Sequence, residues 1–225
     1  MRVIIAAAGG QGKWQNHLGV PSHLAPVDGE PLLARTIRQL SVYQLDVHLT
    51  TPDDDRYDLA GVTRHVLAAG GNEYTSTRGL WSGRERTVLM LGDVYWTDIA
   101  MRSVIRHPSL SYRAFGRYGA SRHTGCPYGE IFAASWGPTE HAKLDRLLVE
   151  VDRLRESGEC TRPPGWVLLR LWQGTPVDRH LVRRPWWQEI NDWTDDFDYA
   201  VDYDRHPAIR KMRAGVRVRP SPLAP

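Results

Sequence analysis

The sequence is poor in cysteine and lysine and has no long apolar run. Its two cysteines, Cys126 and Cys160, lack the C-x-x-C or cysteine–histidine spacing of a metal site, which predicts two free thiols in a reducing compartment. The first apolar run, residues 3–8, is shorter than the roughly 7–15 residues of a signal-peptide core, and no later stretch approaches the roughly 20 apolar residues of a membrane span. We therefore expect a cytoplasmic protein that does not use a membrane.

Arginine supplies nearly all of the positive charge, because only three of the 29 basic residues are lysines. Basic side chains gather in residues 102–123, where aromatic residues are interleaved with them, and again in residues 205–219. This pattern is compatible with a surface that faces a polyanion. Acidic runs at 53–55 and 192–204 balance the charge, so a solvated, arginine-rich face is the alternative interpretation.

Short strand-like runs alternate with longer segments, which predicts an α/β fold with a mostly parallel sheet. The expected strands are residues 3–8, 46–51, 87–91, 112–115, 130–134 and 166–171. The expected helices are residues 31–43, 72–81 and 138–156, the last of them ended by Gly158. At this length one domain, residues 1–212, is expected, followed by a basic, proline-rich tail over residues 213–225.

The first strand runs directly into a glycine loop. Gly9, Gly10 and Gly12 precede Lys13, so bare backbone N–H groups stand beside a cation, which is the arrangement that a nucleotide phosphate needs. Neither the dinucleotide fingerprint nor the P-loop fits, because Trp14 follows Lys13 and the segment continues as a loop. The loop therefore predicts a nucleotide site of another kind.

Two spaced blocks, A-A-G-G-Q-G-K at 7–13 and P-S-H-L-A-P-V-D-G-E-P-L-L at 21–33, carry a family resemblance. They resemble the activation loop of the nucleotidyltransferase-like superfamily (GT-A fold), which includes sugar-phosphate nucleotidyltransferases and molybdenum-cofactor guanylyltransferases. The resemblance implies a three-layer sandwich of the nucleotide-diphospho-sugar transferase type. The nucleotide-binding residues that it implies are Ala8, Gly9, Gly10, Gln11, Gly12, Lys13, Ser22 and His23.

One position in the second block departs from the family pattern. Ser22 stands where the superfamily carries a lysine that neutralises the nucleotide phosphates during phosphoryl transfer. His23 is adjacent and is a candidate for a partial replacement of that charge, although neighbouring side chains in an extended segment point in opposite directions.

Two later blocks resemble the metal-binding segments of the superfamily. Asp93 ends the apolar run L-G-D at 91–93, where the superfamily places the aspartate that binds Mg²⁺ (or Mn²⁺). Asp98 is more simply the start of a helix. Residues 189–199 resemble a D-x-x-T-x-E-D segment that completes the metal site, and Asp192 is the best match, with Asn191 next. Their other acids, Asp195, Asp196 and Asp198, are then expected in the first turn of a helix.

The acceptor half of the site is less strongly marked. Arg117 is a candidate for a phosphate contact, and Tyr128 and Glu130 are candidates for contacts with sugar hydroxyls. Ser76 resembles the region where relatives contact the base, although an N-cap role is equally compatible with it.

Three functions follow from this pattern. The first is the Mg²⁺-dependent transfer of a nucleotidyl group from a nucleoside triphosphate to a sugar phosphate or similar phosphate, with Lys13 and Asp93 as catalytic residues. The second is a GT-A glycosyltransferase that uses a nucleotide sugar, with a glycan or a nucleic acid as acceptor. The third is a nucleotide-binding protein without turnover. The serine at position 22 favours the second and third functions, and the intact activation loop favours the first.

Overall fold

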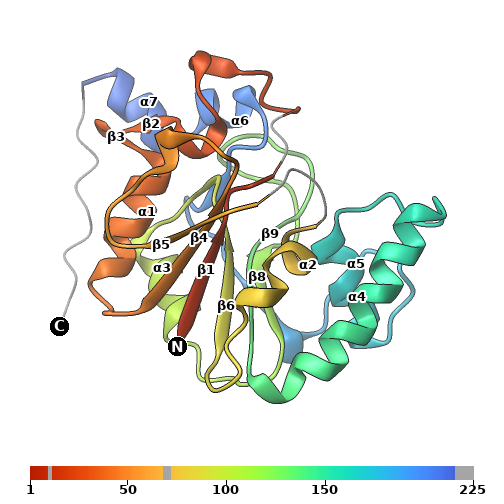
Figure 1. Cartoon of the computed structure of the whole chain (residues 1–225). Coiled ribbons are helices and arrows are strands. Elements are labelled where there is room, and N and C mark those ends of the chain that lie inside the picture. Colours follow the sequence, from red (N-terminus) through yellow and green to blue (C-terminus); the bar gives the residue numbers. More distant parts are fainter. Residues whose placement is uncertain (10–11, 68–71, 216–225) are drawn as a thin grey trace.

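The computed structural model describes residues 1–9, 12–67 and 72–215. A seven-stranded sheet with the order β10-β8-β9-β6-β1-β4-β5 forms its centre (Figure 1). Strand β9 is antiparallel to β6 and β8, and the other neighbouring pairs are parallel. The expected α/β class with a mostly parallel sheet is confirmed. The strands are β1 (Arg2–Ala6), β4 (Asp46–Thr51), β5 (Thr63–Val66), β6 (Thr87–Leu91), β8 (Arg113–Arg117), β9 (Glu130–Trp136) and β10 (Trp187–Glu189).

Helices cover both faces of the sheet, which gives the three expected layers. Figure 1 shows α1 (Leu32–Ser41) and α3 (Asp98–Ile105) on one face, and α2 (Glu73–Thr77), α4 (His141–Glu156) and α5 (Pro164–Gln173) on the other. Alternate residues of β1 serve the two faces: Val3 and Ile5 belong to one apolar core, and Ile4 belongs to the second core. Burial on both faces explains why this central strand is an unbroken apolar run.

A third apolar cluster joins the two ends of the described chain. Trp14 and Val27 from the N-terminal region pack with Phe197, Tyr203 and Ile209. The last two lie on α6 (Ala200–Arg205) and α7 (Pro207–Arg213). Two short antiparallel ladders support this region: β2 (Pro26–Val27) pairs with β3 (Glu30–Pro31), and β7 (Val94–Tyr95) pairs with β11 (Asp195–Asp196). The C-terminal acids are thereby held beside the loop that follows β1.

The expected helices are present, and Gly158 adopts a positive φ of 74° just beyond α4. The expected strand over residues 166–171 is wrong, because this segment lies inside α5. Its apolar residues are buried with no polar face, so the run carries no period that separates helix from strand. Pro164 at the first turn and Gly174 at the left-handed C-cap mark the helix instead.

Residues 195–198 do not begin a helix as expected, because Asp195–Asp196 form β11 and α6 begins at Ala200. Strands β5 and β10 are additions that the sequence did not predict. Of the expected tail, Arg213 is the last residue of α7, and residues 216–225 lie outside the described part of the chain. No helix in the described ranges has the length and apolar character needed to cross a membrane.

Candidate active site

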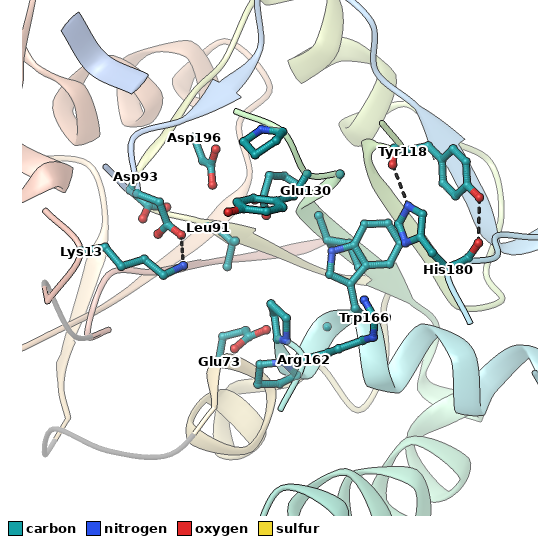
Figure 2. Close-up of a pocket in the computed structure, with 18 of the residues that line it drawn as sticks. Lys13, Glu73, Leu91, Asp93, Tyr118, Glu130, Arg162, Trp166, His180 and Asp196 are labelled. Atoms are coloured by element: carbon teal, nitrogen blue, oxygen red, sulfur yellow. Dashed lines mark hydrogen bonds and ion pairs between the residues drawn. The ribbon is translucent and has the colours of Figure 1, made fainter. Parts of the chain in front are cut away.

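A pocket of about 740 Å³ opens at the carboxyl ends of β1 and β6, the edge where open α/β sheets bind ligands. Because β9 is antiparallel to β6, its first residue, Glu130, lies at this same edge. Figure 2 shows Lys13, Asp93 and Asp196 on one side of the pocket, and Arg162 and Trp166 on the other. Residues from distant parts of the sequence therefore share one cavity.

The position of Asp93 depends on the glycine before it. The Gly92 N–H donates to the Ala6 carbonyl at 2.9 Å, and a Cβ on Gly92 would lie 2.9 Å from the Ala7 Cβ. No larger residue fits there without a shift, so the chain can pass this close to β1 only as glycine. The Phe197 N–H in turn donates to the Asp93 carbonyl at 2.9 Å. This hydrogen bond holds the segment beside Asp93, and Asp196 and Asp198, on either side of Phe197, line the pocket.

Lys13 projects into the pocket from the loop after β1. Its Nζ lies 2.5 Å from a carboxylate oxygen of Asp198 and 5.2 Å from the centre of the Tyr199 ring. Partial burial lowers the pKa of Lys13, but the hydrogen bond and the charge of Asp198 outweigh it and raise the pKa above the ordinary value. Trp14 anchors the loop, because its buried indole donates to the Val20 carbonyl at 2.6 Å. Lys13 is thus charged at neutral pH and paired with Asp198 at the pocket.

Asp93, Glu130, Asp196 and Asp198 form an acid cluster in the pocket. Burial, followed by the charge of Asp198, raises the pKa of Asp93 to about 7 and that of Glu130 to about 7. Burial and the neighbouring acids also raise the pKa of Asp196. Within the described residues, Oδ1 of Asp196 is buried and has no hydrogen-bond partner. Lys13 pairs with Asp198 alone, so the four acids outnumber this cation, and a bound metal ion would stabilise the ionised form of the other acids.

Comparisons with family models and with curated proteins find no match. Solved structures do resemble the chain. A protein from Bacillus anthracis that is described as a glucose-1-phosphate thymidylyltransferase has a TM-score of 0.60 and 16% identity, and the match covers 95% of this chain and 96% of that one. The inositol-1-phosphate CTP transferase from T. maritima has a TM-score of 0.57 and 13% identity, with 96% of this chain and 97% of that chain covered. The CTP:phosphocholine cytidylyltransferase from Streptococcus pneumoniae has a TM-score of 0.53 and 14% identity, with 95% of this chain and 97% of that chain covered. The chain has the nucleotidyltransferase fold.

Within this nucleotidyltransferase fold, several of the expected site residues line the pocket. They are Lys13, Asp93, Tyr128 and Glu130. Half-buried Ala8 and the exposed Gly9 and Gly12 belong to the loop that carries Lys13, and none of the three is a lining residue. Gly10 and Gln11 lie outside the described residues. Ser76 lies on α2 but does not line the described pocket, whereas Glu73 of the same helix does.

Asp192, the expected metal ligand, lies away from the described pocket. Its carboxylate accepts hydrogen bonds from the Thr97 hydroxyl and, at 2.8 Å, from the Thr194 N–H, and it does not line the described pocket. The acids of this segment that do reach the pocket are Asp196 and Asp198, because β11 pairs with β7 only from Asp195 onward. The acid of this segment nearest to the expected role is therefore Asp196, four residues after Asp192.

Arg117 does not fit the expected contact with an acceptor phosphate. Its side chain is buried, and its Nη2 lies 2.8 Å from an Asp195 oxygen. Nη1 donates at 2.6 Å to the carbonyls of both Gly119 and Tyr128. Asp195 also accepts from Ser121 and Thr124. Arg117 therefore holds the base of β11, behind the pocket, instead of lining it.

His23 does not replace the family lysine. Both Ser22 and His23 are buried in a 3-10 turn (Ser22–Leu24), and neither lines the described pocket. Burial lowers the pKa of His23 to about 4, and its Nδ1 lies 3.1 Å from the Tyr57 hydroxyl. His23 is consequently neutral at pH 7.

The basic stretch over residues 102–123 is not an aromatic-laced surface. Tyr112 and Phe115 are fully buried in the core, and only Tyr118 is exposed, at 37%. Sequence reasoning missed the opposite wall of the pocket, which consists mainly of Tyr118, Arg162, Pro163, Pro164, Trp166, Arg170 and His180. The only available signal was the Pro-Pro-Gly-Trp run at 163–166, where α5 begins and where the sequence analysis expects a strand from Trp166 onward.

Proposed function

We propose that this chain transfers a nucleotidyl group from a nucleoside triphosphate to a small phosphate ester and releases pyrophosphate. The observation that carries the proposal is the meeting of Lys13 with the acid cluster in one pocket at the carboxyl edge of the sheet. The neighbours with this fold are named for the transfer of nucleotidyl groups to glucose 1-phosphate, inositol 1-phosphate and phosphocholine. Those acceptors share a phosphate monoester.

In this reaction an oxygen of the acceptor phosphate forms a bond to the α-phosphorus of the triphosphate. The bond from the α-phosphorus to the bridging oxygen breaks, and pyrophosphate leaves with the electron pair. No nucleophilic side chain is required, so the protein contributes position and charge. Lys13 is the cation for the triphosphate: in the free protein Asp198 is its partner, and the phosphates would take the place of Asp198.

The donor set fits a hard divalent cation such as Mg²⁺. Asp93 and Asp196 would hold it, and the unpartnered Oδ1 of Asp196 is an available oxygen ligand. No group of three or more acidic, histidine or cysteine side chains in the described residues has the arrangement of a metal site, but Mg²⁺ bound with phosphates needs only one or two carboxylates. When bound, the ion supplies neutralisation of phosphate charge. Asp93 and Asp196 would be ionised in that state.

The test is pyrophosphate release with Mg²⁺, each of the four common nucleoside triphosphates and a set of sugar 1-phosphates, with phosphocholine as a further acceptor. We expect release with at least one pair, and a loss of release in Asp93→Asn. Asp204→Asn is the matched control, because Asp204 pairs with Arg213 on an exposed surface. Absence of pyrophosphate with every pair would overturn the proposal.

One observation favours a glycosyltransferase as the second candidate. Because Ser22 and neutral His23 occupy the position of the family lysine, the described site lacks one of the cations that serve a departing pyrophosphate. A nucleotide sugar carries only a diphosphate and needs less positive charge. Turnover of nucleotide sugars, with no pyrophosphate from triphosphates, would establish this alternative.

A further inference from the structure

Arg170 is a buried cation in the wall of the pocket opposite Lys13. It lies on α5, and its side chain is 0% exposed although it lines the pocket. In the described part of the chain, its Nε and Nη1 have no hydrogen-bond partner, and no carboxylate forms an ion pair with it. Buried arginines are normally paired with an acid, because an unpaired buried charge is costly. The wall therefore offers unused donors and an uncompensated positive charge.

The charge of Arg170 is not removed by its surroundings. Burial and the nearby charge of Arg162 lower its pKa, but the guanidinium of an arginine stays protonated at neutral pH. Glu73 also lines the pocket, yet it forms no ion pair with either arginine among the described residues. An anion from outside the chain is the partner that this geometry lacks.

Aromatic rings fix the orientation of the Arg170 side chain. His180 Nε2 lies 2.8 Å from the Tyr118 carbonyl, which assigns the ring hydrogen to Nε2 and leaves Nδ1 to accept from Arg170 Nη2 at 3.1 Å. The Tyr118 and His180 rings stack at 4.4 Å, and the Arg170 guanidinium lies 5.4 Å from the centre of the Trp166 ring. The guanidinium is thus held in place before any ligand binds, as a recognition site requires.

We propose that the acceptor carries a second anionic group, a carboxylate or a second phosphate, and that Arg170, with Arg162 at the rim, binds it. This inference rests on the proposed nucleotidyl transfer. The reacting phosphates belong beside Lys13 and the acid cluster, which Figure 2 shows on the other side of the pocket from Arg162 and Trp166. A nucleobase is uncharged at neutral pH, so an unpaired guanidinium matches a charged group of the acceptor better than the base. Guanidinium groups bind carboxylates and phosphates strongly.

The test compares three acceptors that differ only in this group: glucose 1-phosphate, glucuronic acid 1-phosphate and glucose 1,6-bisphosphate. We expect kcat/KM of the wild type to be at least about tenfold higher for one of the two doubly anionic acceptors, and the better of the two identifies the group as carboxylate or phosphate. In Arg170→Met this ratio falls toward one, through a rise in KM of roughly 10- to 100-fold for the preferred acceptor. Arg146→Met, an exposed arginine on α4, is the matched control and keeps the ratio.

Arg162→Met covers the case in which Arg170→Met does not fold, because Arg162 is exposed. It should lower the ratio about two- to fivefold. Calorimetric titration of the three acceptors without nucleotide gives a readout that does not depend on turnover. If no acceptor releases pyrophosphate but the wild type binds a doubly anionic acceptor more tightly and Arg162→Met loses the difference, the proposed function fails and the anion site stands. Equal kcat/KM and equal affinity for all three acceptors would overturn the anion site and leave nucleotidyl transfer intact.

Discussion

Asp93→Asn should make the protein more stable and less active. The substitution keeps the size of the side chain and removes a carboxylate whose pKa is raised from 3.8 to about 7 by burial and then by the charge of Asp198. An unfolded chain loses this proton near pH 4, whereas the folded chain holds it up to about pH 7. Between these values, the folded state binds more protons than the unfolded state, so this carboxyl reduces stability as the pH rises.

The size of the effect follows from the same difference. The pKa of Asp93 rises by about three units, and each unit corresponds to about 1.4 kcal/mol. Above pH 7 this carboxyl can therefore reduce the free energy of unfolding by at most about 4 kcal/mol. Because the other acids of the cluster share this effect, we expect Asp93→Asn to increase the free energy of unfolding by about 1–3 kcal/mol. For a chain of this length, each 1 kcal/mol moves the midpoint of thermal unfolding by roughly 2–4 °C. The variant should therefore melt several degrees above the wild type at pH 8.

Differential scanning calorimetry of both proteins from pH 4 to pH 8 measures this effect. Burial lowers the pKa values of His23, His107 and His206 to about 4, and these groups change the stability of both proteins in parallel. The difference between the two midpoints of thermal unfolding reports Asp93 together with its effect on the other acids of the cluster, and it should grow from its value at pH 4 to a plateau above pH 7. A difference that is constant with pH would refute the reasoning. In parallel, pyrophosphate release should fall at least about 100-fold.

Three other substitutions test separate parts of the site. Lys13→Met should raise KM for the triphosphate roughly 10- to 100-fold in pyrophosphate-release assays, because a charge-assisted contact is lost, while Lys211→Met should not. His23→Phe should keep the triphosphate KM within about twofold, because the histidine is neutral, but should cost about 1 kcal/mol in chemical denaturation through the lost hydrogen bond to Tyr57; a tenfold rise in KM would contradict this. Asp195→Asn should cost roughly 3–5 kcal/mol in the same denaturation assay, because it leaves the Arg117 charge buried without its partner; a loss below about 1 kcal/mol would show that the pair is not needed.

The central strands and the position of Asp93 could be predicted from the sequence. Strands β1, β4 and β6 are buried on both sides and are bounded by loop or turn residues, so their composition alone marks them. Asp93 follows β6 directly, and the end of a parallel strand already specifies the edge of the sheet where a ligand binds. These features are local, and local patterns determine them.

The opposite wall and the second acid could not be predicted in this way. Helix α5 is buried on every side and so lacks the polar face that identifies a helix. The acids between 192 and 198 are alike in chemistry, and only the two-residue ladder between β7 and β11 decides which of them faces the pocket. Such a ladder is a long-range contact that no spacing within the motif records.

That ladder also explains why the site needs both ends of the chain. Along β11 neighbouring side chains point to opposite sides, so Asp195 turns back to Arg117 while Asp196 turns to the pocket. The buried ion pair thus fixes the register of the strand, and a slip by one residue would place the unpaired Arg117 charge in the core and Asp195 in the pocket. The Phe197 N–H donates a hydrogen bond to the Asp93 carbonyl, and the Phe197 ring packs with Trp14 and Tyr203. The same segment therefore sets the positions of Asp93, Asp196 and the loop that carries Lys13. The geometry of the acid cluster is therefore a product of tertiary packing, and loss of the Asp195 pair should disturb nucleotide binding as well as stability.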